Sequence, residues 1–312
     1  MDWTRRWTID APGNRAGAIA LDVGDGTILL ADGWGVAFPA LSVRRLDSAT
    51  GRELARVRTR TPIRAFARAA HVPNAVYFVG DSKVFLHDAS TLERRAVFDT
   101  RIPRYSNGLV DIDADMVVFA TSKALVECHL PTGKSRRPVA LPAYDLARVD
   151  ERPVAVLADG RVLARSGEWS HVGQVGAACS RAFIDPATGR VAALTGARPG
   201  AYDADGRPQR VTTPRSAEAW VASVRGPWQP RRVELPFDAM MVGIVEDRVV
   251  AVDSVLAQTR IASRSFADDS GAWSEEVLEG WFRGFVGTIG FAMDGTPERG
   301  ASAVAVSLVA PA

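Results

Sequence analysis

The feature that most constrains this chain is a pair of landmarks that recurs along its whole length. Short runs of β-favouring residues, such as Ala75 to Val79 and Arg248 to Val252, recur near residues 28, 77, 117, 156, 192, 250 and 290. A second strand and a polar turn follow the first six of these runs, with the turns near residues 51, 90, 133, 167, 227 and 270. Repeats of about 40–50 residues with four short strands each are typical of propeller blades. The sequence therefore predicts an all-β fold, a seven-bladed β-propeller, with residues 1–312 in a single domain.

Turn residues within the repeats indicate antiparallel hairpins. Gly80 to Ser82 separates Ala75 to Val79 from a second run, and Asp159-Gly160 stands between two further runs in the same way. Glycine accepts positive φ at little cost, which suits tight turns between antiparallel strands. A pair of β-sandwiches would show less regular spacing, and a parallel β-helix would need much shorter repeats.

The predicted blades span residues 15–58, 63–98, 105–140, 144–175, 181–235, 239–279 and 284–309, the last one together with residues 3–9. We expect the strand from Trp3 to Ile9 to join the last blade and close the ring, because closure removes exposed sheet edges. The unit at 181–235 is longer than the others. It fits one blade with a hairpin inserted around Tyr202 to Gly206, or two blades of which one is degenerate.

Two turns have the pattern Asp-x-x-Thr-Gly, at Asp47 to Gly51 and at Asp185 to Gly189. These turns resemble those of the WD40, YVTN and quinoprotein-like propeller superfamilies, and the resemblance extends over most of the chain. The Gly-His and Trp-Asp signatures of WD40 repeats and the tryptophan-docking repeat of quinone-dependent dehydrogenases are absent. The resemblance implies a propeller fold and a binding role, and it transfers no catalytic residue.

Composition narrows the class of partner and the compartment. The formal net charge is +2, which gives no reason to expect nucleic acid or a membrane surface as a partner. No apolar run is long enough for a signal peptide or a membrane-spanning helix, so we expect a cytoplasmic protein. The only cysteines, Cys128 and Cys179, have no metal-ligand or redox spacing and are predicted to be buried thiols. The basic residues are almost all arginine, which indicates a high-GC, bacterial genome.

A search for catalytic motifs identifies no catalytic residue. His71, His87, His129 and His171 show no metal-ligand spacing, and no Gly-x-Ser-x-Gly elbow or phosphate-binding loop is present. We therefore expect no metal and no cofactor. Trp169, Trp228 and Trp273 share a register at the start of outermost strands, which predicts packing between neighbouring blades.

The loops that lead into the innermost strands are the best candidates for a binding site. In a propeller these loops lie on one face around the central channel, where several blades converge. Arginine occurs in five of the seven loops, beside aromatic residues, and such a rim suits an anionic or peptide-like ligand. The predicted ligand-binding residues are Arg64, Arg104, Tyr105, Tyr144, Arg181, Asp238, Trp281, Arg283 and Trp34. Because arginine is abundant throughout the chain, an ordinary solvated surface is the competing interpretation.

Two functions of different classes follow. The first is a non-catalytic binding or scaffold propeller that engages a protein, a peptide or a small anionic ligand through this face. The second is an enzyme, a hydrolase, lyase or isomerase, with polar residues converging in the central channel from Asp32, Arg104, Asp145 and Asp238. Two acids, or an acid and a histidine, that meet in a deep central pocket would favour the enzyme.

Overall fold

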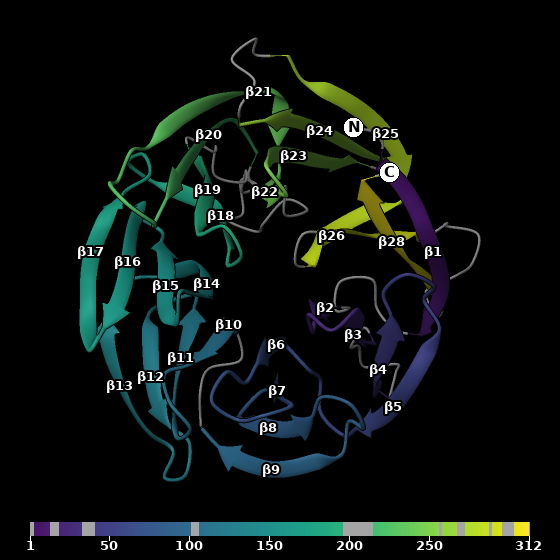
Figure 1. The fold of residues 1–312 in the computed structure, drawn as a ribbon, viewed down its shortest axis with the longest axis vertical. Coiled ribbons are helices and arrows are strands. Elements are labelled where there is room, and N and C mark those ends of the chain that lie inside the picture. The colour runs from purple at the N-terminus through teal and green to yellow at the C-terminus, as the bar shows by residue number, and fades with distance from the viewer. Residues whose placement is uncertain are drawn as a thin grey trace, which may run out of the picture.

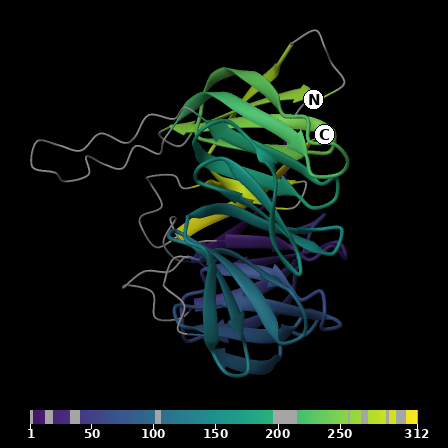
Figure 2. The ribbon, with the colours of Figure 1, turned by 90° about the vertical axis from the view of Figure 1, so that its left-hand side faces the viewer.

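The computed structural model describes residues 3–12, 19–32, 41–100, 106–195, 215–255, 258–266, 272–286, 289–294 and 303–311. Side chains are not described for residues 10–12, 19, 106–107, 255, 281, 283, 289–294 and 303–311. The described strands form seven antiparallel sheets of four strands each. Figure 1 shows these sheets side by side around a ring, and Figure 2 shows the ring from its side. The all-β propeller predicted from the sequence is therefore confirmed.

Each sheet runs from an innermost to an outermost strand. The first four sheets are β2 (Ile19–Asp22), β3 (Thr27–Ala31), β4 (Leu41–Asp47) and β5 (Glu53–Thr59); β6 (Ala65–Arg68), β7 (Ala75–Val79), β8 (Lys83–Asp88) and β9 (Arg94–Asp99); β10 (Ser106–Asp111), β11 (Met116–Thr121), β12 (Leu125–His129) and β13 (Lys134–Val139); β14 (Ala143–Val149), β15 (Arg152–Leu157), β16 (Arg161–Ser166) and β17 (Glu168–Gln174). The other three are β18 (Cys179–Asp185), β19 (Arg190–Thr195), β20 (Ser216–Ser223) and β21 (Arg231–Ala239); β22 (Met241–Val245), β23 (Arg248–Val255), β24 (Gln258–Ser265) and β25 (Ser274–Glu279); β26 (Trp281–Val286), β27 (Ile289–Asp294), β28 (Ala303–Pro311) and β1 (Trp3–Pro12). We number the blades one to seven in this order.

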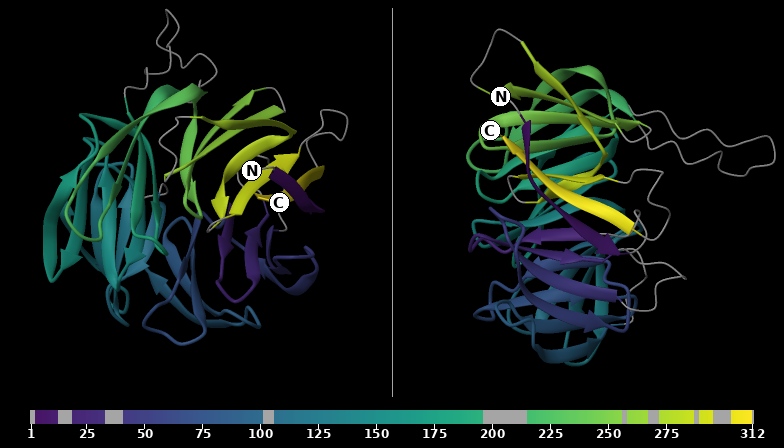
Figure 3. Two further views of the ribbon diagram at one scale, coloured as in Figure 1. Left: turned by 45° about the horizontal axis from the view of Figure 1, so that its top comes forward. Right: turned by 90° about the vertical axis from the view of Figure 1, so that its right-hand side faces the viewer.

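The seventh blade combines both ends of the chain. Strand β1 pairs antiparallel with β28, from Trp3 opposite Pro311 to Pro12 opposite Ala303. Figures 1 and 3 show the two strands side by side, with β1 on the outer side of the blade. Among the described residues from Cys179 to Ala239, the strands form a single four-stranded sheet. The hairpin predicted around Tyr202 lies outside the described residues.

Second strands are the most deeply buried, and this explains why they give the clearest sequence signal. All five residues of β7 are buried, whereas the outermost strand β9 of the same blade alternates between exposed and half-buried residues. A second strand is covered on both faces by neighbouring blades, so both faces of the strand are apolar. An outermost strand has one solvated face and therefore alternates.

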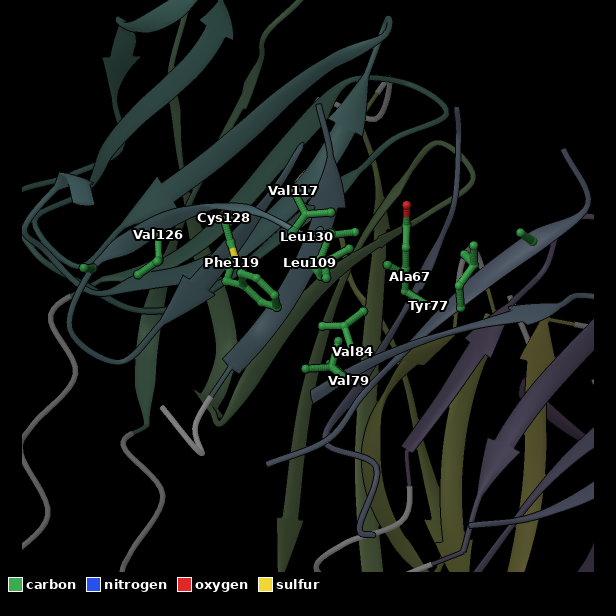
Figure 4. Packing of buried hydrophobic residues seen from close by; sticks show 14 residues of the cluster. Ala67, Tyr77, Val79, Val84, Leu109, Val117, Phe119, Val126, Cys128 and Leu130 are labelled. Carbon is green, nitrogen blue, oxygen red and sulfur yellow. The ribbon is translucent and has the colours of Figure 1, made fainter. Parts of the chain in front are cut away.

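The hydrophobic core lies between the faces of adjacent blades, not within one blade. In Figure 4, Tyr77 and Val79 from blade two approach Val117 and Phe119 from blade three, with Cys128 in the same cluster. Phe119 and Cys128 are fully buried. Each such seam buries one face of two sheets, as packed β-sheets require. Both cysteines are free and buried, as predicted.

The Asp-x-x-Thr-Gly turn between β4 and β5 shows why this pattern occurs. The Asp47 carboxylate accepts hydrogen bonds from the Thr50 amide and hydroxyl, both at 2.8 Å, and Gly51 has a φ of 72°. A Cβ at Gly51 would lie 2.8 Å from the Trp7 ring, and the Trp7 indole donates to the Ser48 carbonyl at 2.9 Å. The turn of blade one therefore packs against Trp7 of blade seven and accepts its indole hydrogen bond.

Candidate binding face

The antiparallel order places one end of every innermost strand at a common edge of the ring. In each blade the innermost strand begins where the second strand ends and the third begins. We call this the mouth edge. The predicted site residues fall here in sequence: Arg64 directly precedes β6, Tyr144 and Arg181 lie near the starts of β14 and β18, and Asp238 immediately precedes the segment that leads into β22.

Not all of the predicted rim can be placed. Trp34, Arg104 and Tyr105 lie outside the described residues. Trp281 and Arg283 belong to β26, but only the backbone of these two residues is described. The side chains of Arg64, Tyr144, Arg181 and Asp238 remain for a direct comparison, and they lie in three different environments.

Arg64 is held by its own blade. Its Nε donates to the Asp81 carboxylate at 2.7 Å, and its amide donates to the Val79 carbonyl at 2.7 Å. Asp81 lies in the turn between β7 and β8, so this arginine clamps the segment before β6 to the hairpin beside it. The guanidinium is already paired with a carboxylate at the mouth edge, which makes a structural role for Arg64 the direct explanation.

Tyr144 and its neighbours close the seam between blades four and five. Tyr144 is half-buried against the apolar cluster that contains Val156 and Val191. The adjacent Asp145 carboxylate accepts hydrogen bonds from the Ile184 amide at 2.6 Å and the Leu146 amide at 2.8 Å. Burial raises the pKa of Asp145 to about 6, and these two amide donors only partly oppose that rise.

The Cys179 thiol, beside the same seam, is in an environment that makes it unreactive. Its thiol donates to the Arg181 carbonyl at 2.9 Å, and burial raises the pKa of Cys179 to about 12. A thiol with a pKa this high is protonated at neutral pH and is a poor nucleophile. The buried, unreactive thiol predicted from the sequence fits this environment.

Arg181 and Asp238 are the two predicted residues whose side chains are exposed and form no ion pair or hydrogen bond with the part of the chain that is described. Arg181 lies on an innermost strand, and Asp238 lies where blade five passes to blade six. A guanidinium with no internal partner retains all five N–H donors for a ligand.

A feature that sequence reasoning missed is a repeated β-bulge near the mouth edge. The innermost strands of blades three, four, five and seven each contain one extra residue relative to their second strand. The extra residues are Asn107, Tyr144, Ser180 and Arg283. Bulges redirect side chains and are frequent beside binding sites. No residue type is shared by the four positions, so the sequence offers no signal for them.

The acids named for an enzyme do not converge in the described part of the ring. Asp32 forms a buried ion pair with Arg44 at 3.2 Å, Asp145 is satisfied by amide groups, and Asp238 is exposed on another blade. Burial raises the pKa of Asp32, and the Arg44 charge opposes that rise. Arg104 lies outside the described residues. Among those described, no three His, Cys, Asp or Glu side chains are grouped as metal ligands would be.

The edge opposite the mouth uses arginine to join blades. Arg148 of blade four donates to the carboxylate of Asp111 in blade three at 3.0 Å, and also to its carbonyl. Arg225 of blade five donates to Asp150 of blade four at 2.7 and 2.9 Å. The predicted tryptophan packing is confirmed: Trp169, Trp228 and Trp273 pack in three successive seams, each against a cluster built from two neighbouring blades.

The four-stranded sheets around the ring form a β-propeller whose fold is similar to that of a WD40 domain. The structure of the Neurospora crassa Pan2 WD40 domain is similar to this chain, with a TM-score of 0.60, 12% sequence identity, and coverage of 98% of this chain and 96% of that chain. In all, 1014 chains of solved structures match, and a fold shared so widely hosts many functions, so this likeness shows the fold alone. No family model and no curated protein sequence matches the chain. The described residues include no helix long and apolar enough to cross a membrane.

Proposed function

We propose that this protein is a binding or scaffold propeller that engages a protein, a peptide or a small anionic ligand at its mouth edge. The observation that carries the proposal is the repeated bulge, which alters four innermost strands near this edge and leaves their other ends regular. Bulges that persist at equivalent positions are features of a site rather than defects. The exposed, unpaired Arg181 supplies a cation on one of the bulged strands.

We further propose a seven-bladed ring closed non-covalently by β1, because a closed ring makes the mouth edge a continuous rim. The seven four-stranded sheets and the β1–β28 pairing support this closure. We place the protein in the cytoplasm, where two free thiols would stay reduced.

The test is affinity capture from an extract of the source organism, with tagged wild type and two triple variants. The rim variant is Arg104→Ala/Arg181→Ala/Arg283→Ala, and the control is Arg6→Ala/Arg137→Ala/Arg152→Ala, which removes the same charge from exposed sites elsewhere. We expect the rim variant alone to lose its ligand, by about tenfold or more, because charge-assisted hydrogen bonds disappear. Equal capture by both variants would place the binding surface elsewhere.

A further inference from the structure

A groove lies at the seam between blades one and two and is lined by residues of both blades. It has a volume of about 500 Å³, and its walls come from the end of β5, the segment between β5 and β6, β7 and β8, and the start of β9. Clefts of this size are in the range that holds ligands. All of the lining residues are described, and two of them, Thr61 and Ile63, belong to the segment before Arg64 at the mouth edge.

Three arginines surround this groove, and its lining contains no acid. Arg58, Arg60 and Arg94 are exposed, and their guanidinium groups form no ion pair or hydrogen bond with another described residue. By contrast, the guanidinium of Arg56, two residues before Arg58 on β5, is paired: it forms two hydrogen bonds with Glu53, at 3.0 and 2.6 Å. Arg58 lies near the end of β5 with its side chain exposed, and Arg60 follows directly after the strand ends at Thr59. A concentration of unpaired guanidinium groups favours carboxylates.

The floor of the groove is aromatic and contains a hydrogen-bond acceptor. Phe78 and Phe85 line it, and the His87 ring stacks on Phe78 with centroids 4.0 Å apart. His87 Nδ1 lies 2.8 Å from the Leu92 carbonyl, which can only accept, so Nδ1 carries the proton. Burial lowers the pKa of His87, the hydrogen bond with the Leu92 carbonyl partly opposes this, and the Arg94 charge lowers it further, which favours the neutral imidazole. The Nε2 atom of a neutral ring with this tautomer is an acceptor for an N–H group.

The strand beside the groove has a free edge. β5 is the outermost strand of blade one and, among the described strands, pairs with β4 alone. A free edge offers backbone N–H and C=O groups that an added strand can use. The groove's arginines, aromatic rings and histidine acceptor call for a ligand that carries carboxylate, apolar and N–H groups along an extended backbone. An extended acidic peptide carries all of these groups, and a simple anion does not.

We propose that this groove binds an extended acidic segment of a partner protein. The segment adds to the edge of β5, its carboxylates contact Arg58, Arg60 and Arg94, and an apolar side chain packs toward Phe85. This groove adjoins the mouth edge at Thr61 and Ile63. Its three arginines are not among the residues proposed for the mouth edge, so the two proposals are tested by different variants. The competing role for these arginines is to prevent unwanted pairing at an exposed edge strand, which requires no ligand.

The test is fluorescence anisotropy with a fluorescein-labelled hexapeptide of alternating glutamate and leucine. We expect saturable binding that falls about tenfold or more in Arg58→Ala/Arg60→Ala/Arg94→Ala and stays unchanged in the control Arg6→Ala/Arg137→Ala/Arg152→Ala. Replacing the three groove arginines by lysine keeps the charge but removes the planar fork, and should give an intermediate affinity. A peptide in which lysine replaces glutamate should not bind, and one in which glycine replaces leucine should bind more weakly.

Three results would overturn the proposal. They are equal affinity for wild type and the groove triple variant, no saturable binding up to about 1 mM peptide, or binding of 3-phenylpropionate without binding of the peptide. The last would identify a small organic anion as the occupant. Circular dichroism melts of every variant separate a lost site from a lost fold.

Discussion

Two seams of this ring use arginine in opposite ways. Between blades three and four, the Glu127 side chain is fully buried and accepts hydrogen bonds from Arg136 at 2.7 Å, Arg165 at 2.9 Å and the Trp169 indole at 2.9 Å. Between blades one and two, Arg58 and Arg94 border an open groove with no acid in its lining. The first seam is closed here by buried, paired charge. In the second seam Arg68 also joins the blades, through the Asp22 carbonyl at 3.0 Å, but the charges around the groove are unpaired.

The difference shows that one buried acceptor decides what an arginine does. Burial alone raises the pKa of Glu127, and the hydrogen bonds from Arg165 and Arg136 outweigh it, so the pKa is lowered overall. The ionised carboxylate therefore holds its three donors in place, and breaking such a buried pair leaves charge uncompensated. Where no acceptor is buried, guanidinium groups stay in solvent and contribute little to stability.

The largest effect should come from removing that acceptor. Glu127→Ala leaves Arg165, whose side chain is 15% exposed, without its carboxylate, and should lower the free energy of unfolding by about 4 kcal/mol. Urea denaturation measures this. Glu168→Ala is the control, because this acid is 77% exposed and 3.6 Å from Arg136, and should change stability by less than about 0.5 kcal/mol. Equal effects of the two variants would show that the closed seam does not depend on Glu127.

A somewhat smaller effect is expected at the seam between blades seven and one. Trp7, which is 8% exposed, fills the space over Gly51, so Trp7→Ala leaves a cavity and should lower the free energy of unfolding by about 3 kcal/mol. Chemical denaturation gives the value, with the exposed neighbour substitution Arg6→Ala as the control. A loss below about 1 kcal/mol would mean that an aromatic ring closes this seam less well than the ions close theirs.

The seam between blades four and five should respond to pH. The pKa of Asp145 is about 6 in the fold against 3.8 unfolded, so the native state binds the proton more tightly. Its contribution to stability is therefore full below the unfolded value and is lost as pH rises through about 6, a change of about 1–3 kcal/mol because the residue keeps some solvent contact. Thermal melts of wild type and Asp145→Asn from acid to neutral pH measure the difference. A difference that does not vary across that range would contradict the raised pKa.

The smallest effect should be at the open groove. Replacing Arg58, Arg60 and Arg94 together by alanine should leave the free energy of unfolding within about 0.5 kcal/mol of wild type, because exposed and unpaired charges add little. Urea denaturation beside Glu127→Ala tests the comparison between the two seams directly. A loss above about 1 kcal/mol would show that these arginines also hold the blades together.

The fold was largely predictable, because its strongest signals are local. A second strand sandwiched between blades must be apolar on both faces, so runs such as Ala75 to Val79 and Val154 to Leu157 mark one strand per blade. The binding face was predictable only as a set of loops. Tyr144 is a bulge residue that packs in a seam, and Arg64 is held by Asp81, which follows 17 positions later. Neither outcome has a signal in the neighbouring residues.

The sequence by itself determined that this chain forms repeated antiparallel strands with buried thiols and tryptophans between blades, because burial and turn formation depend on residue type and short spacing. Only the tertiary structure decided which arginines join blades and which stay unpaired. Arg165 and Glu127 are 38 positions apart, and Arg148 and Asp111 are 37 apart, roughly one blade in each case. Whether a guanidinium meets a carboxylate across a seam depends on the register of two packed sheets, and that register exists only once the ring has formed.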